Sequence, residues 1–286
     1  ILRSRPENEA NILFCGYPAG PANKQGRIVA DVICGKKAAY KGSQGTSVMK
    51  FFEQVVACTG EKEESLRAAR IPYRKTFTVS ASHAGYYPGG SQMIVKLLYT
   101  PDEGKILGAQ IVGGDGVDKR IDHLANAVRF GLTVYDLTEM ELAYAPPFSS
   151  AKDPVNMAGY VAQNVLEGSM VPFYPEDVEN LPEDAIRIDV RTPGEVEALG
   201  TVPGFVNIPL DELRQRLAEV DLTKPLYVTC QVGLRGYVAQ RILNQSGAKE
   251  VHNLSGGYNL YSAYQKDLAG MADAEKKNCT PCGKQE

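Results

Sequence analysis

The chain has 286 residues, 43% hydrophobic and 23% charged, which is the composition of a globular protein with room for two domains. Its net charge of −3 argues against nucleic-acid binding, which usually needs a concentrated basic face. No apolar run approaches the ~18 residues that span a bilayer, and no charged-then-apolar leader is present, so we expect a cytoplasmic protein with no membrane partner.

The six cysteines favour the same compartment. They are too sparse for a disulfide framework in a chain of this length, which indicates a reducing environment. Because the sequence opens on Ile1, we interpret it as a fragment of a longer protein.

The first half of the chain predicts one domain over residues 19–170, after an unassigned stretch over residues 1–18. A group of apolar residues before Gly35 follows the spacing of one helix face. Alternating apolar residues then predict three strands, and two further helices follow them. These five elements are expected at residues 76–83, 93–99, 106–112, 118–130 and 154–167. Strands followed by helices indicate an α+β domain.

Turn and cap residues support these boundaries. Residues 101–104 predict a hairpin turn, and Gly131 follows the end of a helix. Asp153 is positioned to cap the next helix, with Pro154 at its first turn and Gly168 after its end. In the first strand we expect the apolar side to be the buried one. That side comprises Phe77, Val79 and Ala81.

The second half predicts a domain over residues 171–270, in which residues 171–175 are a linker and residues 271–286 a polar tail. Short strands and helices alternate here, which indicates an α/β fold with a parallel sheet covered on both faces. Strands are expected at 186–190, 205–208, 226–229 and 251–254, and helices at 194–199, 210–220, 236–245 and 258–268. Ligands of such sheets bind at the carboxyl ends of the strands.

Cys230 occupies such a position, between an apolar strand and a helix. A loop of this kind directs peptide N–H groups and the positive helix end toward the sulfur. Arg235 adds a charge that cannot be lost, so the loop favours the nucleophilic thiolate and would stabilise a persulfide. The remaining loop residues are Gln231, Val232, Gly233, Leu234 and Gly236.

The loop length separates two chemistries. Four residues lie between Cys230 and Arg235, one fewer than in cysteine phosphatases of related architecture, and the tighter loop suits a sulfur atom better than a phosphate. A phosphatase or arsenate reductase stays open as an alternative, as does a non-catalytic module that dimerises and carries sulfur to a partner.

Residues 173–270 resemble a rhodanese domain, on segments 188–191, 204–210 and 230–236. The resemblance implies a sulfurtransferase that accepts sulfur from a sulfane-sulfur donor as a persulfide on Cys230. Thr201 departs from the family, in which many members carry histidine at this place. We interpret Asp189 and Arg191, at the end of a strand, as a structural ion pair.

The first domain resembles the dimerisation domain of flavin- and NAD(P)H-dependent disulfide reductases, closest to the coenzyme A-disulfide reductases and their persulfide- or polysulfide-reducing relatives. The resemblance rests on segments 19–27, 82–89, 117–122 and 142–150. It implies a homodimer, FAD and NAD(P)H as cofactors of the intact parent, and CoA disulfide, CoA persulfide or polysulfide as substrates. Tyr86 and Tyr144 are implied to reach the redox site of the partner subunit, or alternatively to be interface aromatics.

Four residues are implied to lie against the flavin, at a helix start where small side chains allow close approach. They are Gly20, Pro21, Ala22 and Gln25. No Gly-x-Gly-x-x-Gly motif occurs in the sequence, and the family's flavin fold, nicotinamide fold and redox cysteine would precede Ala19. We therefore expect no firm FAD binding by this chain alone.

The other candidates are weaker. Cys279 and Cys282 form a C-x-x-C pair that supplies only two of the ligands of a structural zinc, and we expect no metal site. Cys34 and Cys58 lie among apolar residues and are expected in the core. His83 is interpreted as a packing residue.

Overall fold

The computed structural model describes the backbone of residues 19–278 and the side chains of residues 19–271. The chain divides into two compact units, with the boundary between Leu166 and Glu167. The segment 1–18, with Cys15, and the pair Cys279 and Cys282 lie outside the described residues.

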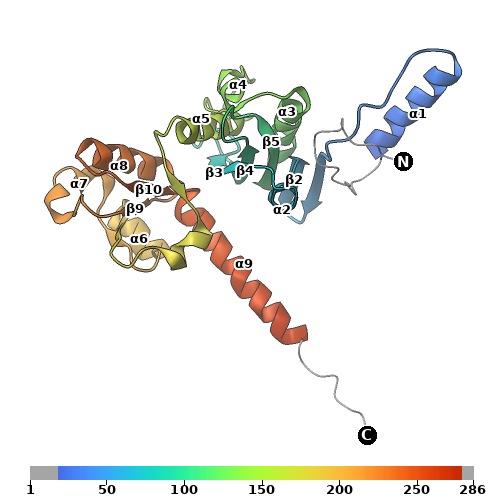
Figure 1. The fold of residues 1–286 in the computed structure, drawn as a ribbon. Helices are drawn as coiled ribbons and strands as arrows, with labels where there is room; N and C mark the ends of the chain where they lie inside the picture. Colours follow the sequence, from blue (N-terminus) through green and yellow to red (C-terminus); the bar gives the residue numbers. More distant parts are fainter. Residues whose placement is uncertain (1–18, 279–286) are drawn as a thin grey trace, which may run out of the picture. The chain divides into compact units, whose positions relative to one another are not determined.

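The first unit is built on a five-stranded antiparallel sheet with the strand order β1-β2-β5-β4-β3 (Figure 1). Its strands are β1 (Ser47–Phe51), β2 (Gln54–Gly60), β3 (Arg74–Ala81), β4 (Gln92–Tyr99) and β5 (Ile106–Gly113). Its helices are α1 (Ala19–Ile33), α2 (Glu63–Ala68), α3 (Val117–Phe130), α4 (Val134–Glu139) and α5 (Pro154–Leu166). The α+β prediction is confirmed, but the sequence interpretation missed β1 and β2.

One face of this sheet forms the core with α3 and α5. In β3 the expected buried side is wrong, because Thr76 and Thr78 are buried while Phe77 and Val79 are half-buried. The register gives the reason: the two threonines pair with Leu97 and Val95 of β4, which point to the helix side. Residues paired across neighbouring strands share one face.

The opposite face carries a row of apolar side chains across all five strands. The row follows the strand pairing and comprises Met49, Val56, Val112, Ile94 and Val79. Met49, Val56 and Val112 are 53%, 38% and 44% exposed. An exposed apolar row of this length on a sheet is typical of an interaction surface.

Several boundary predictions are confirmed. Gly104, in the turn between β4 and β5, has φ 70°. Gly131 ends α3 in the left-handed conformation. The Asp153 carboxylate accepts a hydrogen bond of 3.0 Å from the Val155 N–H and so caps α5.

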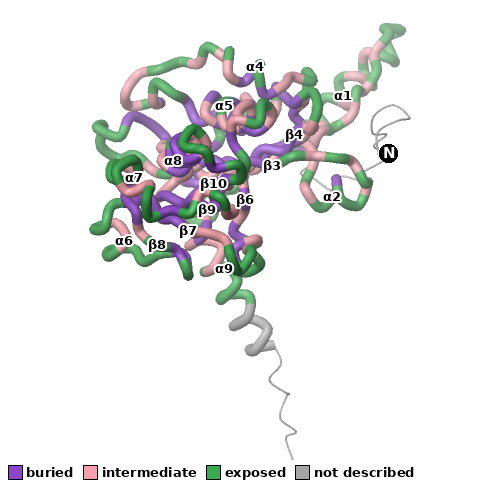
Figure 2. Tube along the Cα trace, turned by 60° about the vertical axis from the view of Figure 1, so that its left-hand side comes forward, coloured by how far each residue is buried: buried purple, intermediate pink, exposed green. Residues whose placement is uncertain are grey.

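The second unit contains a five-stranded parallel sheet in the order β6-β10-β9-β7-β8. Its strands are β6 (Pro172–Phe173), β7 (Ile186–Asp189), β8 (Val206–Asn207), β9 (Leu226–Thr229) and β10 (Val251–Leu254). Figure 2 shows the buried character of β9 and β10, two of the three inner strands. The expected parallel α/β fold is confirmed.

Its helices are α6 (Pro193–Leu199), α7 (Leu210–Leu213), α8 (Leu234–Gln245), α9 (Gly257–Asn278) and the 3-10 helices η1 (Pro175–Asn180) and η2 (Leu217–Glu219). No described helix is long and apolar enough to cross a membrane.

Three sequence predictions for this unit are wrong in detail. The expected linker contains β6, whose Phe173 is buried beside β10. The expected helix over 210–220 is broken into α7 and η2, which lets Leu213 and Val220 both reach the core. The last helix continues ten residues beyond Leu268, to Asn278, into the range predicted as a tail.

Candidate functional site

Cys230 directly follows β9, the central strand of the parallel sheet, and is fully buried. Its side chain belongs to the apolar cluster that includes Ile188, Val190 and Val228. The strand therefore fixes the position of the thiol at the carboxyl edge of the sheet, where the sequence placed it.

A backbone amide of the loop contacts this sulfur. The Gly233 N–H donates a hydrogen bond of 3.1 Å to Cys230 Sγ. Gly233 has φ 107°, a conformation that side-chain-bearing residues rarely adopt, and it is the N-cap of α8. The glycine thus allows the chain to turn back so that an N–H group and the start of a helix lie at the thiol.

The segment that follows β10 binds the backbone of the Cys230 loop. The sequence interpretation missed this segment. The carbonyl oxygens of Cys230 and Gln231 accept hydrogen bonds from the N–H groups of Tyr258 and Asn259, at 2.7 and 3.0 Å. Gly257, with φ 61°, lies so close that a Cβ there would be 2.5 Å from the Cys230 carbonyl oxygen. The consecutive glycines 256 and 257 after a strand were the available signal.

Arg235 lies in the first turn of α8, and its guanidinium is paired with a carboxylate. Nη1 and Nη2 donate to the two carboxylate oxygens of Glu195 at 2.7 and 2.6 Å. The pKa of Arg235 is raised, first by this hydrogen-bonded pair and to a smaller extent by the charges of Cys230 and Asp189. The bidentate pair is the strong form of such an interaction.

Glu195 was not singled out from the sequence. It is the third residue of α6 and forms a capping box with Thr192, whose N–H and hydroxyl donate to Glu195 Oε2 at 2.9 and 3.0 Å. The pKa of Glu195 is lowered to about 2, chiefly by its hydrogen bond to Arg235. The T-x-x-E pattern was the available sequence signal, because it predicts a capping box that holds this carboxylate at the start of α6.

The expected ion pair of Asp189 and Arg191 is present and fully buried, with 2.6 Å between Nη2 and Oδ2. Thr201, the departure from the rhodanese pattern, donates its hydroxyl to the same carboxylate at 3.1 Å. Arg191 also donates to the Gln231 side-chain oxygen at 3.3 Å, and its guanidinium lies 4.1 Å from the centre of the Tyr258 ring. The buried ion pair therefore holds Arg191 where it contacts both Gln231 of the loop and Tyr258.

The other predicted loop residues differ in their burial. Leu234 is 60% exposed, whereas Gln231 and Val232 are half-buried. Gly236 packs against the Asn253 side chain of β10, where no larger residue would fit. Of these residues, Leu234 presents its apolar side chain to solvent, while Gly236 packs against the sheet.

In the first unit, the structure brings Tyr86 and Tyr144 together. Their hydroxyl oxygens lie 3.0 Å apart, although both side chains are exposed. The pKa of Tyr144 is raised, first by the hydrogen bond with Tyr86. Two predicted residues from separate loops thus form one polar pair.

A buried arginine lies behind both tyrosine loops. Arg120 Nη2 donates to the Ser82 carbonyl at 2.9 Å, to Ser149 Oγ at 3.0 Å and to Asp153 Oδ2 at 2.9 Å. The N–H of Ala84 also donates to the Ser149 carbonyl at 3.0 Å. The ion pair of Arg120 and Asp153 therefore joins the segment that leads to Tyr86 with the one that follows Tyr144.

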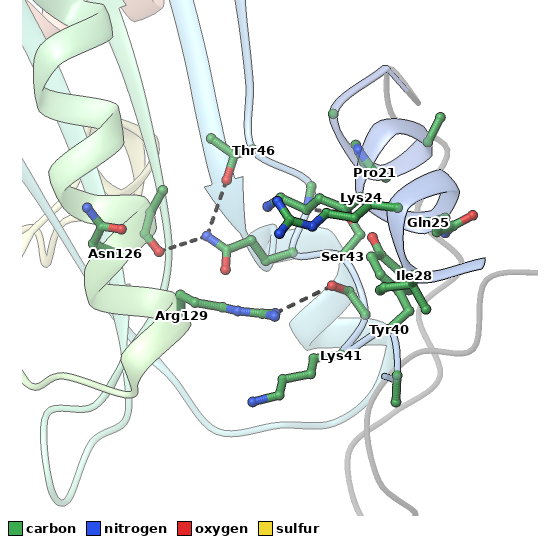
Figure 3. A pocket seen from close by; sticks show the side chains of 18 of the residues that line it. Pro21, Lys24, Gln25, Ile28, Tyr40, Lys41, Ser43, Thr46, Asn126 and Arg129 are labelled. Atoms are coloured by element: carbon green, nitrogen blue, oxygen red, sulfur yellow. Dashed lines mark hydrogen bonds between the residues drawn. The ribbon is translucent and has the colours of Figure 1, made fainter. Parts of the chain in front are cut away.

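A cavity of about 890 Å³ lies in the first unit, between α1 and residues of α3 and the 39–46 segment (Figure 3). Gly20, Pro21, Ala22 and Gln25, the residues expected to lie against a flavin, are among its lining. No residue of α1 is buried. On the wall of this hollow Gly20 and Ala22 are exposed, whereas Pro21 and Gln25 are half-buried.

The remaining candidates differ from expectation. Cys34 is exposed and Cys58 half-buried, so the expected core position is wrong for Cys34. Cys58 faces Ser47, with 3.1 Å between Sγ and Oγ. His83 is buried, its Nδ1 is 3.1 Å from the Ala84 carbonyl oxygen, and its ring packs edge-on against Tyr87, as a packing role requires.

Two protein families match the chain. Residues 46–154 match the dimerisation domain of the pyridine nucleotide-disulphide oxidoreductases. Residues 174–264 match the rhodanese-like domain.

The chain is also similar to curated and solved proteins. It is 40% identical over 145 residues to the coenzyme A disulfide reductase of Staphylococcus haemolyticus, and 41% identical over 143 residues to that of Staphylococcus aureus. Each match covers 50% of this chain and 32% of the relative, so the matched segment spans about a third of the length of these enzymes.

Two solved structures match over both units. Reduced Bacillus anthracis CoADR-RHD is 48% identical, with a TM-score of 0.83, over 87% of this chain and 45% of the other. The NAD-dependent persulfide reductase of A. fulgidus is 34% identical, with a TM-score of 0.77, over 84% of this chain and 43% of the other.

Proposed function

We propose that this chain, in which a rhodanese-like domain follows a pyridine nucleotide-disulphide oxidoreductase dimerisation domain, transfers sulfane sulfur through a persulfide on Cys230. The observation that carries the proposal is the Gly233 N–H at 3.1 Å from Cys230 Sγ, at the start of α8. A hydrogen bond and a helix N-terminus both favour an anionic sulfur at this place.

The chemistry proceeds in two balanced steps. The Cys230 thiolate attacks the outer sulfur of a donor such as thiosulfate; the donor S–S bond breaks, a Cys230 S–S bond forms, and sulfite leaves with the electron pair. An acceptor nucleophile, for example cyanide or a thiolate, then attacks the outer sulfur of the persulfide and regenerates the Cys230 thiolate. The Gly233 amide holds the charge on sulfur in both states.

Mass spectrometry of the intact chain tests this proposal. After incubation with thiosulfate or cysteine persulfide and removal of the donor, we expect a gain of one sulfur atom that cyanide removes as thiocyanate. Cys230→Ser should abolish the gain, while Cys34→Ser, at an exposed cysteine outside this domain, should leave it unchanged. Thiocyanate formation that persists in Cys230→Ser would reject the assignment.

In the intact parent we propose that this sulfur chemistry is coupled to FAD- and NAD(P)H-dependent reduction of CoA disulfide, CoA persulfide or polysulfide. FAD would supply the two-electron carrier between nicotinamide and sulfur. Two features of α1 support this proposal: no heavy atom lies within 4 Å of a Cβ built at Gly20, so a ligand can approach closely, and the first-turn N–H groups of a 15-residue helix suit an electron-rich ligand. Gly20, Pro21, Ala22 and Gln25 would lie against it.

We also propose a homodimer through the first domain, with the apolar row of the sheet in the interface. Val112 lies at the middle of that row and is 44% exposed. Val112→Asp should shift the protein toward monomer in light scattering, because an unpaired carboxylate would be buried. Val206→Asp, at a 62% exposed valine of the other domain, is the matched control and should leave the mass unchanged.

A further inference from the structure

The two arginines beside the Cys230 loop each form an ion pair with a carboxylate. Arg235 holds Glu195 through two hydrogen bonds of 2.7 and 2.6 Å, and Arg191 holds Asp189 in a fully buried pair. These four groups therefore sum to zero charge. Stabilisation of a second negative charge beside the thiolate would require one of the pairs to open.

The Arg235 pair is the one that can open. Its side chains are 32% and 30% exposed, whereas those of Arg191 and Asp189 are 0% exposed. Arg235 also lies in the first turn of the helix that starts at the loop, and its pKa responds to the charge of Cys230. Glu195 is anchored separately by Thr192, so the carboxylate stays in place and draws the guanidinium toward α6.

We propose that Glu195 is a specificity-determining residue for the sulfur donor, because it withholds the Arg235 charge from the reacting sulfur. This inference rests on the proposed function of Cys230. A site with neutralised arginines disfavours dianionic donors such as thiosulfate, whose charge must come close to the thiolate. It accepts organic persulfides more readily, since the persulfide group R–S–S⁻ carries one negative charge where thiosulfate carries two. In transfer from such a donor the Cys230 thiolate attacks the outer sulfur, the donor S–S bond breaks, the S–S bond of the Cys230 persulfide forms, and the thiolate R–S⁻ leaves with the electron pair.

The size of the effect follows from electrostatics. One additional unit charge about 10 Å from another, at the effective dielectric of a protein surface, changes a rate constant by roughly tenfold. Glu195→Gln leaves the side chain isosteric and frees the guanidinium. We therefore expect kcat/KM for thiosulfate, with cyanide as acceptor, to rise about tenfold in this variant. The value for cysteine persulfide should change by less than about threefold, since the donor lacks the second charge.

The experiment uses the full chain and three companion variants. The donor ratio is kcat/KM for thiosulfate divided by kcat/KM for cysteine persulfide. Glu197→Gln, on the same helix and exposed, changes the net charge equally and should leave this donor ratio unchanged. In Glu195→Gln combined with Arg235→Met the gain for thiosulfate should disappear. In Glu195→Asp the side chain is too short to keep both hydrogen bonds to Arg235, so this variant should also raise the donor ratio. It tests the role of Glu195 if Glu195→Gln does not fold.

The outcomes are distinguishable. A wild-type chain that loads no sulfur from either donor overturns the proposed function itself. A wild-type chain that loads sulfur, with a donor ratio unchanged in the folded Glu195 variants, overturns only the role of Glu195. An equal gain in Glu197→Gln would show that net charge, and not the Arg235 pair, controls the donor, and would also overturn it.

Discussion

The hydroxyl oxygens of Tyr86 and Tyr144 lie 3.0 Å apart, although 58 residues separate them in the chain. The two loops that carry them meet because Arg120 and the Ala84–Ser149 hydrogen bond join their backbones. Exposed phenols in contact are suited to share or deliver one proton.

Replacement of Tyr86 should change the titration of Tyr144. The hydrogen bond with Tyr86 raises the pKa of Tyr144, so Tyr86→Phe should lower that pKa toward the ordinary value for tyrosine, about 10. NMR of the chain with ring-labelled tyrosine measures the pKa of Tyr144, and Tyr144→Phe assigns its signal. Tyr135→Phe, at another exposed tyrosine, should have no effect. An unchanged Tyr144 titration in Tyr86→Phe would argue against the contact.

The Arg120–Asp153 pair should be important for stability. Both side chains are buried, so Arg120→Met leaves an unpaired carboxylate and should lower the free energy of unfolding by about 3–5 kcal/mol. Asp153→Asn should also destabilise, and the double variant should lose less than the two single losses added together. Urea unfolding measures these values. Arg129→Met, at an exposed arginine of the same helix, should change stability by no more than about 0.5 kcal/mol.

If the double variant lost as much as both single variants combined, the pair would not act as a unit. The Tyr144 signal offers a second measurement, since a disrupted network should separate the two tyrosine loops and lower the pKa of Tyr144.

Ionisation of Glu63 should make the free energy of unfolding decrease as the pH falls into the acid range. Burial raises its pKa, but hydrogen bonds from Lys96 and Tyr73 and the charge of Lys75 outweigh burial and lower the pKa to about 2. Because the folded-state pKa lies below the unfolded one, the stabilisation is complete above pH 4.5 and is lost as the pH falls toward about 2. The loss should amount to at most about 3 kcal/mol.

Denaturant unfolding of wild type and Glu63→Gln between these pH values checks the sign. The variant should be less stable at neutral pH and should show a shallower decline with acid. Glu139→Gln, at an exposed position, is the control. A steeper acid dependence in Glu63→Gln would contradict the assignment.

The close approach of Gly257 to the Cys230 carbonyl should be required for the loop. Gly257→Ala places a Cβ 2.5 Å from that oxygen and imposes a strained φ of 61°. Gly168 has a similar φ of 71° with no atom within 4 Å, so Gly168→Ala measures the backbone strain alone, about 1 kcal/mol. We expect Gly257→Ala to lose about 1–3 kcal/mol more and to slow sulfur loading of Cys230. Equal stability losses in the two variants would show that the loop can yield.

The sequence determined the elements whose causes are local. Apolar periodicity placed α3 and α5, Asp153 and Gly131 marked helix ends, and the position of Cys230 between a strand and a helix follows from adjacent residues. Such signals depend on neighbours a few positions away in the chain, and they need no knowledge of the fold.

The tertiary structure decided which face of each element is buried and which charges meet. Thr76 and Thr78 are buried because their partners on β4 face the helices, a register that alternation in β3 alone does not fix. Glu195 pairs with Arg235 across 40 residues, and Tyr86 with Tyr144 across 58. Contacts at such separations depend on strand order and loop packing, so the sequence identified the thiol and Arg235, while the fold revealed that Arg235 pairs with Glu195.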